Sequence, residues 1–376
     1  MNIQEIISIR RHLHKHPEIS NCEYKTSEYI TNYLNNLNPQ KTISIQKTGK
    51  AFVFNGEQEG PTIVFRAELD ALQIQENTDL YYSSVHNNVA HLCGHDGHMA
   101  IIAGLAKKIS EKPPKKGKAV ILFQPAEEIE QGAKDVVENY EFIQLNADYI
   151  FALHNIPGAE KHKIFLKNGS FAAASKGMTI KLKGKTSHAA EPEKGISPAM
   201  AISKIISQLH NLKENKSLFS DFILLTIIHI QLGEIAFGTS PAEAQIMITL
   251  RTFENNDMTK LTWQTEQICK EIATEEKLDI SFSYNEVFPA TVNSAECVEL
   301  IQKAATENNY EIEYISTPFK WSEDFGYYTE KYKGGFFGLG AGIYQPALHN
   351  ANYDFPDDII ETGINMFYSI YKEKCF

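Results

Sequence analysis

Several side chains able to bind metal stand at or within five residues after the ends of short apolar runs of the chain. They are Asp70 after residues 62–65, Glu127 and Glu128 after residues 119–123, and His154 after residues 149–153. Ligands of open α/β sheets bind at the carboxyl ends of the strands, so we expect these groups to meet at one edge of one sheet. Cys93 and His95, which precede a helical pattern, and His349, near the C-terminus, are further candidates.

The spacing of Cys93 and His95 places a thiolate and an imidazole two positions apart, and both groups suit a divalent ion such as zinc. A buried cysteine beside helix-capping residues would show the same pattern. Glu127 and Glu128 are more informative, because adjacent carboxylates repel each other unless a cation or a shared proton offsets their charge. One of them can ligate metal while the other accepts a proton from bound water, although a solvated acidic turn is an equally valid interpretation.

The remaining candidates are ambiguous by themselves. His154 is also compatible with a hydrogen-bonded core histidine, and His349 with a surface histidine. Asp70 can orient a ligand histidine, or it can simply cap the turn that follows its strand.

A second group of histidines, near the N-terminus, consists of His12, His14 and His16. Its helical spacing beside Arg10, with Pro17 after it, favours a structural helix end over a metal site.

Alternating strand and helix patterns predict an α/β fold. Apolar runs typical of buried strands occupy residues 62–65, 119–123, 149–153 and 336–339, and helical patterns occupy residues 23–37 and 98–109. This alternation predicts a mainly parallel sheet with helices on both faces. From about residue 176 the order becomes β-α-β-β-α-β, as in a ferredoxin-like domain. We therefore predict a discontinuous catalytic, metal-binding domain of residues 1–175 and 287–376, with residues 176–286 inserted into it.

The composition excludes several classes of protein. The chain has 376 residues and a formal net charge of −11, with no run rich in lysine and arginine, so nucleic acid is not an expected partner. No apolar stretch approaches the roughly 20 residues of a membrane helix, and no membrane partner is expected. Residues 1–5 lack the features of a secretory signal, and the five cysteines are scattered rather than arranged as a disulfide framework. A cytoplasmic, two-domain protein is the expectation.

Ordered motifs run along nearly the whole chain. They are residues 10–14 (RRHLH) with Pro17 and Glu18, 66–72 (RAELDAL), 93–98 (CGHDGH), 123–128 (FQPAEE), His154 with Pro157, 187–190 (SHAA), 323–325 (EDF) and 348–350 (LHN). With these motifs the chain resembles the metal-dependent amidohydrolases of the dinuclear zinc aminopeptidase and carboxypeptidase-like superfamily. This family includes N-acyl-L-amino acid amidohydrolases, hippurate hydrolases, plant auxin-conjugate hydrolases and N-acetyldiaminopimelate deacetylases.

The resemblance implies a centre of two divalent metal ions, zinc or manganese, with cobalt or nickel also acceptable. The implied ligands are Cys93 as the bridge, His95, Glu128, His154 and His349. Glu127 is implied to be the general base and Asp70 a carboxylate that orients a ligand.

The resemblance also gives the inserted residues 176–286 a role as lid and dimerisation domain. His188 of this domain is implied to contact the substrate and stabilise the oxyanion across a homodimer interface. By itself, His188 is typical of an ordinary loop histidine.

The chain departs from the family at three positions. Relatives usually carry Asp where Glu68 stands and Pro where Gln73 stands, and we expect both changes to be tolerated because neither residue is a ligand. More important is Gly238, where relatives carry an asparagine that helps to hold the substrate. Arg251 is retained and can pair with a substrate carboxylate, so the departure affects substrate preference more than the hydrolytic chemistry.

The expected function is metal-dependent hydrolysis of the amide bond of small N-acyl amino acids, such as N-acetyl or N-benzoyl compounds, which releases a carboxylate and the free amino acid. A narrower alternative is an N-acetyldiaminopimelate deacetylase of lysine biosynthesis. A non-catalytic acyl-amino-acid binding protein on the same fold is another, because fold alone does not imply function. A cysteine hydrolase with Cys93 as nucleophile and His95 or His98 as base would leave the paired glutamates unexplained.

Overall fold

The computed structural model describes residues 1–376, apart from the side chain of Lys216. The chain divides into two compact units. The first unit contains Met1–Phe171, Thr291–Pro318 and Glu323–Phe376, and the second contains Ala172–Ala290 and Phe319–Ser322. Among the described residues, no helix combines the length and the apolar character needed to cross a membrane.

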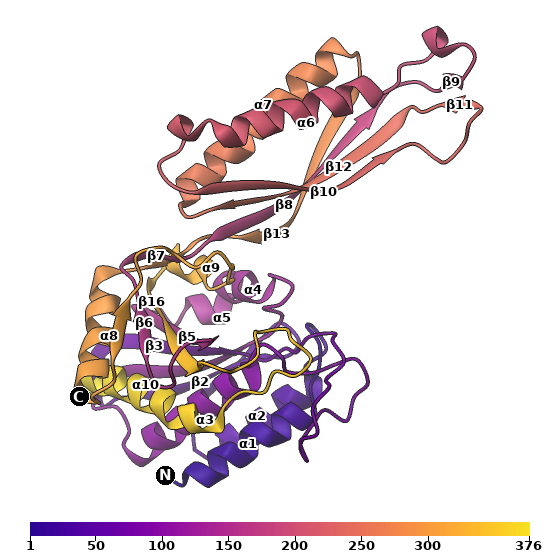
Figure 1. Ribbon diagram of the computed structural model, residues 1–376. Coiled ribbons are helices and arrows are strands. Elements are labelled where there is room, and N and C mark those ends of the chain that lie inside the picture. The colour runs from indigo at the N-terminus through magenta and orange to yellow at the C-terminus, as the bar shows by residue number, and fades with distance from the viewer. The chain divides into compact units, whose positions relative to one another are not determined.

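The first unit is built on an eight-stranded sheet with the strand order β1-β2-β4-β3-β5-β16-β6-β15 (Figure 1). Its strands are β1 (Lys41–Ile45), β2 (Gly49–Asn55), β3 (Gln58–Glu68), β4 (Lys116–Gln124), β5 (Tyr149–Pro157), β6 (Ile164–Leu166), β15 (Ile312–Tyr314) and β16 (Lys333–Gly342). The central strands β4, β3, β5 and β16 are parallel, whereas β1 and β2 are antiparallel additions at one edge. The predicted α/β fold with a mainly parallel sheet is confirmed. A separate two-stranded sheet pairs β7 (Gly169–Ala172) with β14 (Thr291–Asn293).

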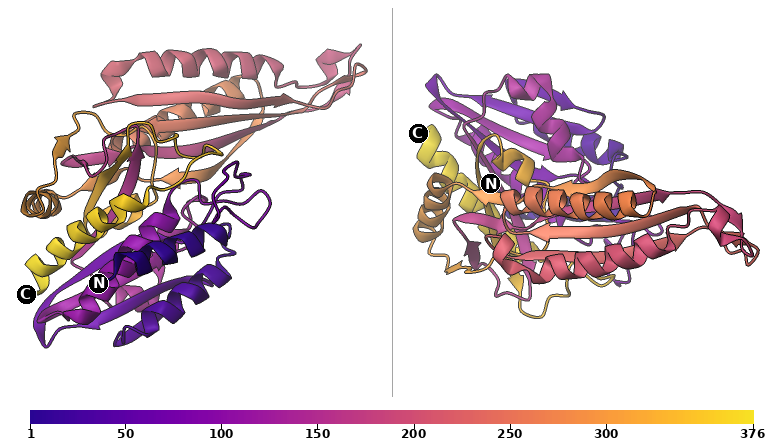
Figure 2. Two further views of the ribbon diagram at one scale, coloured as in Figure 1. Left: turned by 60° about the horizontal axis from the view of Figure 1, so that its bottom comes forward. Right: turned by 90° about the horizontal axis from the view of Figure 1, so that it is seen from above.

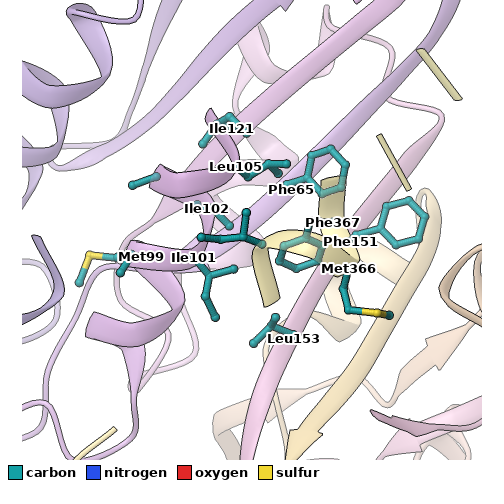
Figure 3. Packing of buried hydrophobic residues seen from close by; sticks show 14 of the residues in the cluster. Phe65, Met99, Ile101, Ile102, Leu105, Ile121, Phe151, Leu153, Met366 and Phe367 are labelled. Atoms are coloured by element: carbon teal, nitrogen blue, oxygen red, sulfur yellow. The ribbon is translucent and has the colours of Figure 1, made fainter. Parts of the chain in front are cut away.

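Helices cover both faces of this sheet. They are α1 (Ile3–Lys15), α2 (Tyr24–Asn35), α3 (His95–Glu111), α4 (Gly132–Glu138), α5 (Tyr140–Ile143), α8 (Ala295–Glu307), α9 (Gly326–Thr329), the short η3 (Asp357–Ile359) and α10 (Ile360–Cys375). Helices α1, α3 and α10 pack side by side on one face, and α4 and α5 lie on the other (Figures 1 and 2). Between sheet and helices, the ring of Phe65 lies 6.0 Å from that of Phe151 and 5.3 Å from that of Phe367 (Figure 3). These fully buried aromatic side chains hold β3, β5 and α10 in one core.

The second unit contains an antiparallel four-stranded sheet with the order β10-β12-β8-β13. Its elements are β8 (Ala174–Lys183), β9 (Ser187–His188), η1 (Pro192–Lys194), α6 (Ala199–Glu214), η2 (Lys216–Leu218), β10 (Ile223–Leu232), β11 (Thr239–Ser240), β12 (Glu243–Thr252), α7 (Asn255–Glu275) and β13 (Asp279–Phe288). Helices α6 and α7 lie side by side over one face of the sheet (Figure 2). The order β8-α6-β10-β12-α7-β13 is the predicted ferredoxin-like arrangement. Strand β10 forms one edge of this sheet.

Candidate metal centre

Three neighbouring parallel strands of the first unit present candidate side chains at their carboxyl ends. Asp70 follows the end of β3, Glu127 and Glu128 follow the end of β4, and His154 lies near the end of β5. Because β4, β3 and β5 are adjacent and parallel, these groups converge at one edge of the sheet.

The turn after β4 is held in a strained conformation. Ala126 adopts a left-handed backbone with φ of 53°, which costs an alanine about 1–3 kcal/mol. Its N–H donates to Oε1 of the buried Glu23 at 2.9 Å, and its carbonyl oxygen accepts from the N–H of Gly132 at 3.1 Å. These bonds fix the turn, and they therefore fix the two glutamates that follow it.

A glycine shapes the segment that enters α3. Gly94 has a φ of 97°, and a Cβ atom on it would lie only 2.5 Å from Oδ1 of Asn155. Glycine alone satisfies both conditions, because it tolerates positive φ and has no side chain. The turn brings the flanking Cys93 and His95, both buried, to the same edge as the strand ends.

The five predicted ligands lie together in the first unit. The donor atoms of Cys93, His95 and His154 lie within 4.8 Å of one another, and so do those of Cys93, Glu128 and His349. Cys93 belongs to both groups, and His95 also belongs to a group with Glu127 and Glu128. In the first group, Cys93 Sγ lies 3.5 Å from His154 Nε2. In the second group, His349 Nε2 lies 3.9 Å from Glu128 Oε1.

The chemistry of these donors fits a pair of divalent cations. His95 Nε2 and Glu128 Oε1 are buried and have no hydrogen-bond partner among the described residues. Burial, together with the charges of Glu128 and Glu127, raises the pKa of the Cys93 thiol well above its ordinary value, so a thiolate here requires a compensating cation. Sulfur, nitrogen and oxygen donors together suit a borderline-soft ion such as zinc.

Glu127 lies beside the ligand set. One of its carboxylate oxygens is 3.8 Å from His95 Nε2, and its side chain is buried. Carboxylate oxygens of Glu323 and Asp324 also lie within 4.8 Å of a carboxylate oxygen of Glu127. Both of these groups accept hydrogen bonds from the fully buried Arg66. Burial, followed by the charge of Glu323, raises the pKa of Glu127 well above its ordinary value.

Asp70 contacts two of the predicted ligands in different ways. The ring Nδ1 of His95 lies 2.8 Å from the backbone oxygen of Asp70, whereas the nearer carboxylate oxygen is 3.7 Å away. The carboxylate instead accepts from the backbone N–H of Glu128 at 2.9 Å and from the hydroxyl of Ser20 at 2.7 Å. The sequence predicts a carboxylate that orients a histidine, and the structure places the backbone carbonyl nearest to that histidine.

A buried network of polar side chains, which the sequence patterns did not predict, lies close to these ligands. His98 Nδ1 lies 2.8 Å from Oε2 of Glu68, and His98 Nε2 lies 2.6 Å from Oδ1 of Asn155. Asn155 packs against Gly94, so the network supports the segment between Cys93 and His95. The signals in the sequence are the departure at Glu68 and His98 at the end of the motif of residues 93–98.

The two remaining predicted residues belong to the second unit. His188 lies on β9, pairs in register with Thr239 of β11, and accepts from the N–H of Ala190 at 3.1 Å through Nδ1. Arg251 lies on β12, and its Nη1 donates to the backbone oxygen of Lys320 at 2.9 Å. Their roles toward a substrate stay predictions.

Comparison with known proteins agrees with this geometry. Residues 64–373 match the model of Peptidase family M20/M25/M40. The chain is 31% identical to N-acetyldiaminopimelate deacetylase of Bacillus subtilis (strain 168), over 99% of this chain and 100% of the relative. It is 32% identical to hippurate hydrolase of Campylobacter jejuni, over 96% of this chain and 94% of the relative.

A solved structure from Bacillus subtilis, of a dinuclear metal-binding peptidase of the M20 family, superposes with a TM-score of 0.84. It is 28% identical, and the match covers 98% of this chain and 97% of that one. The chain therefore belongs to Peptidase family M20/M25/M40 and is a metallo-amidohydrolase.

Proposed function

We propose that the protein hydrolyses the amide bond of N-acyl amino acids and releases a carboxylate and the free amino acid. The observation that carries this proposal is the pair of donor groups that share Cys93, with the buried carboxylate of Glu127 beside them. The names of the relatives, which include an N-acetyldiaminopimelate deacetylase and a hippurate hydrolase, support the same class of substrate.

We propose that Cys93, His95, Glu128, His154 and His349 hold the two divalent ions. When bound, such ions would polarise the scissile carbonyl and lower the pKa of a nearby water to about 7. The thiolate donor favours zinc by its softness, and manganese is the alternative.

Glu127 acts as the general base in this proposal. It accepts a proton from the attacking water and delivers that proton to the nitrogen of the leaving amine. Its buried position and raised pKa suit a group that must carry a proton between two steps. His188 donates a hydrogen bond to the carbonyl oxygen as negative charge develops there, and Arg251 pairs with the carboxylate of the amino acid.

We further propose that the second unit is an inserted lid and dimerisation domain. Strand β10 at the edge of its sheet carries exposed apolar side chains, among them Ile228 (59% exposed) and Ile230 (38% exposed). An open strand edge of this kind is a template for pairing with another strand, and a second copy of the chain supplies one. The cysteines are free thiols. Because thiols stay reduced in the cytosol, we propose a cytoplasmic location.

A panel of N-acetyl, N-benzoyl and indoleacetyl amino acids, together with N-acetyldiaminopimelate, tests the proposed reaction. The metal-loaded enzyme should release free amino acid from at least one class, lose this activity with a chelator, and regain it with zinc or manganese. Selective turnover of N-acetyldiaminopimelate would favour the narrower alternative, which the relative at 31% identity supports. Binding of these compounds without release of product would contradict the enzymatic proposal.

A further inference from the structure

Arg10 of α1 is fully buried and contacts carboxylates from two distant parts of the chain. Its Nε lies 2.8 Å from Oδ2 of Asp96, its Nη2 donates to Oδ1 of Asp354, and its Nη1 donates to Oδ1 of Asp357 at 3.3 Å. Removing a charged group from water costs several kcal/mol unless its partners have good geometry. Three carboxylates offset the charge of this arginine, two of them through hydrogen bonds and Asp96 as a close ion pair, although Arg10 is not one of the proposed metal ligands.

Asp96 connects Arg10 to the turn that carries the proposed ligands Cys93 and His95. Asp96 directly follows His95 at the start of α3, and its Oδ2 also lies 2.9 Å from Nδ1 of His14. The side chains of Asp96, Arg10 and His14 are all fully buried, so solvent does not screen their attraction. Helix α1 therefore holds the turn that presents Cys93 and His95.

The loop of residues 343–356 carries His349 and contains no helix or strand. The side chain of His349 is half exposed, and its backbone is left-handed with φ of 63°. A strained, half-exposed residue on a long irregular loop keeps one position only where its surroundings fix it. One contact that fixes His349 is a backbone hydrogen bond. Its N–H donates to the backbone oxygen of Leu92, the residue before Cys93, at 2.8 Å.

Asp354 provides a further contact at the far end of this loop, next to Tyr353, whose hydroxyl accepts from Nδ2 of Asn155. Oδ1 of Asp354 accepts from Arg10, its Oδ2 accepts from the hydroxyl of Tyr82 at 2.8 Å, and its backbone oxygen accepts from the side chain of Gln345. Arg10 is thus bound at the same time to the neighbour of His95 and to the end of the His349 loop.

We propose that Arg10 is a positioning residue that holds the His95 turn and the His349 loop together, so that the ion bound by His349 is held more tightly while Arg10 contacts Asp354. It acts through Asp96 and Asp354 and not on reacting atoms. This inference rests on the ligand set of the proposed function. It gives a role to the arginine and histidine group that the sequence places at a structural helix end.

The sharpest test is Asp354→Asn, with Asp357→Asn as the matched control. Asp354→Asn keeps the Arg10–Asp96 pair and removes the charge that fixes the loop. Asp357→Asn also removes a partner of Arg10, but Asp357 lies in η3, beyond the loop, and Arg11 approaches it more closely, at 2.6 Å. The metal-free form of each variant is titrated with Zn²⁺ in competition with a chromophoric chelator, and its thermal unfolding is followed by circular dichroism.

We expect Asp354→Asn to weaken the binding of one of the two ions about 10- to 100-fold, as is typical for residues that support metal ligands. The second ion should bind as in the wild type. When the same variant is loaded with Co²⁺ in place of Zn²⁺, the absorption band of a cobalt–thiolate bond from Cys93 should still be present. Asp357→Asn should change neither affinity by more than about 5-fold, the range of partly exposed ion pairs. Asp354→Glu, which restores the charge, should recover most of the lost affinity.

Two outcomes overturn different parts of the account. If the wild type binds two zinc ions and Asp354→Asn binds both equally well, with only a lower unfolding midpoint, Arg10 has a structural role alone and this inference is wrong. If the wild type binds no zinc, the proposed ligand set itself is wrong.

Discussion

A carboxylate oxygen of Glu127 lies 3.8 Å from Nε2 of His95, and that nitrogen has no hydrogen-bond partner among the described residues. The separation is too long for a hydrogen bond. This relationship places an uncommitted carboxylate next to a proposed metal ligand, which is where a general base is needed.

Glu127→Gln should lower kcat about 100-fold or more, because removal of a general base typically costs about 10²- to 10⁴-fold. The variant should still bind metal, since the amide replaces the base and not a proposed ligand. Steady-state kinetics and elemental analysis of the same sample check both expectations. Glu128→Gln is the control, and it should lose metal together with activity. Near-normal turnover by the metal-loaded Glu127→Gln variant would contradict the assignment.

Gly238→Asn should lower KM for N-acyl amino acids several-fold, because it introduces the substrate-holding amide that the family resemblance implies at this position. The substitution is sterically allowed, since a Cβ atom on Gly238 would meet no other atom within 4 Å. Gly238→Ala adds the Cβ without the amide and should leave KM unchanged. Equal KM values for all three proteins would show that this position does not contact the substrate.

Ile228→Lys should convert the proposed homodimer into a monomer. Lysine on a strand edge opposes pairing with another strand, and Ile228 is an exposed residue of the edge strand β10. Light scattering after size-exclusion chromatography measures the mass. Tyr140→Lys changes another exposed side chain, in the first unit, and should leave the mass unchanged. A wild type that is already monomeric, or an unchanged mass for Ile228→Lys, would contradict the proposed interface.

The contact between Glu76 and His14 predicts that the stability of the first unit depends on pH. Burial would raise the pKa of Glu76, but hydrogen bonds from His14 and Thr78 lower it from 4.5 to about 2. Since the folded state has the lower pKa, this contribution is complete above about pH 4.5 and is lost as the pH falls to about 2. Burial would lower the pKa of His14, but Asp96 and Glu76 raise it from 6.5 to about 9. The contribution of His14 is therefore complete below about pH 6.5 and is lost as the pH rises to about 9.

Glu76→Gln should lower the free energy of unfolding at neutral pH by about 1–3 kcal/mol, because a hydrogen bond between charged groups is lost. The difference from the wild type should narrow as the pH falls from 4.5 to about 2. Urea unfolding at a series of pH values measures it. Glu141→Gln, at a surface ion pair, should change little at any pH. A difference that stays constant over this pH range would exclude the ionised pair as its source.

Local patterns and one general rule were enough to predict the sheet edge at which the candidate side chains gather. The apolar runs at residues 119–123 and 149–153 lie within β4 and β5, so the residues that follow them lie at the predicted edge. The helix that carries His95 begins at this residue and not at His98, where the apolar pattern begins, because the left-handed Gly94 ends the preceding loop. Apolar periodicity does not report such a backbone turn.

The remaining features depend on contacts between distant residues. Strand β1 was missed because its residues alternate between exposed and buried over a short length, without a continuous apolar run. The contact of Arg10 with Asp354 joins the N-terminal helix to a loop near the C-terminus, and no local pattern predicts it. The role of the Asp70 backbone oxygen toward His95 is likewise invisible in a sequence, because every residue has such an oxygen.

The most direct test of the account is the number of ions that the metal-free protein binds in a calorimetric titration with Zn²⁺. Because Cys93 belongs to both donor groups, the account predicts two ions per chain in the wild type and weaker binding of both in Cys93→Ala. A wild type that binds fewer than two ions, or a Cys93→Ala variant that binds two as tightly as the wild type, would contradict it.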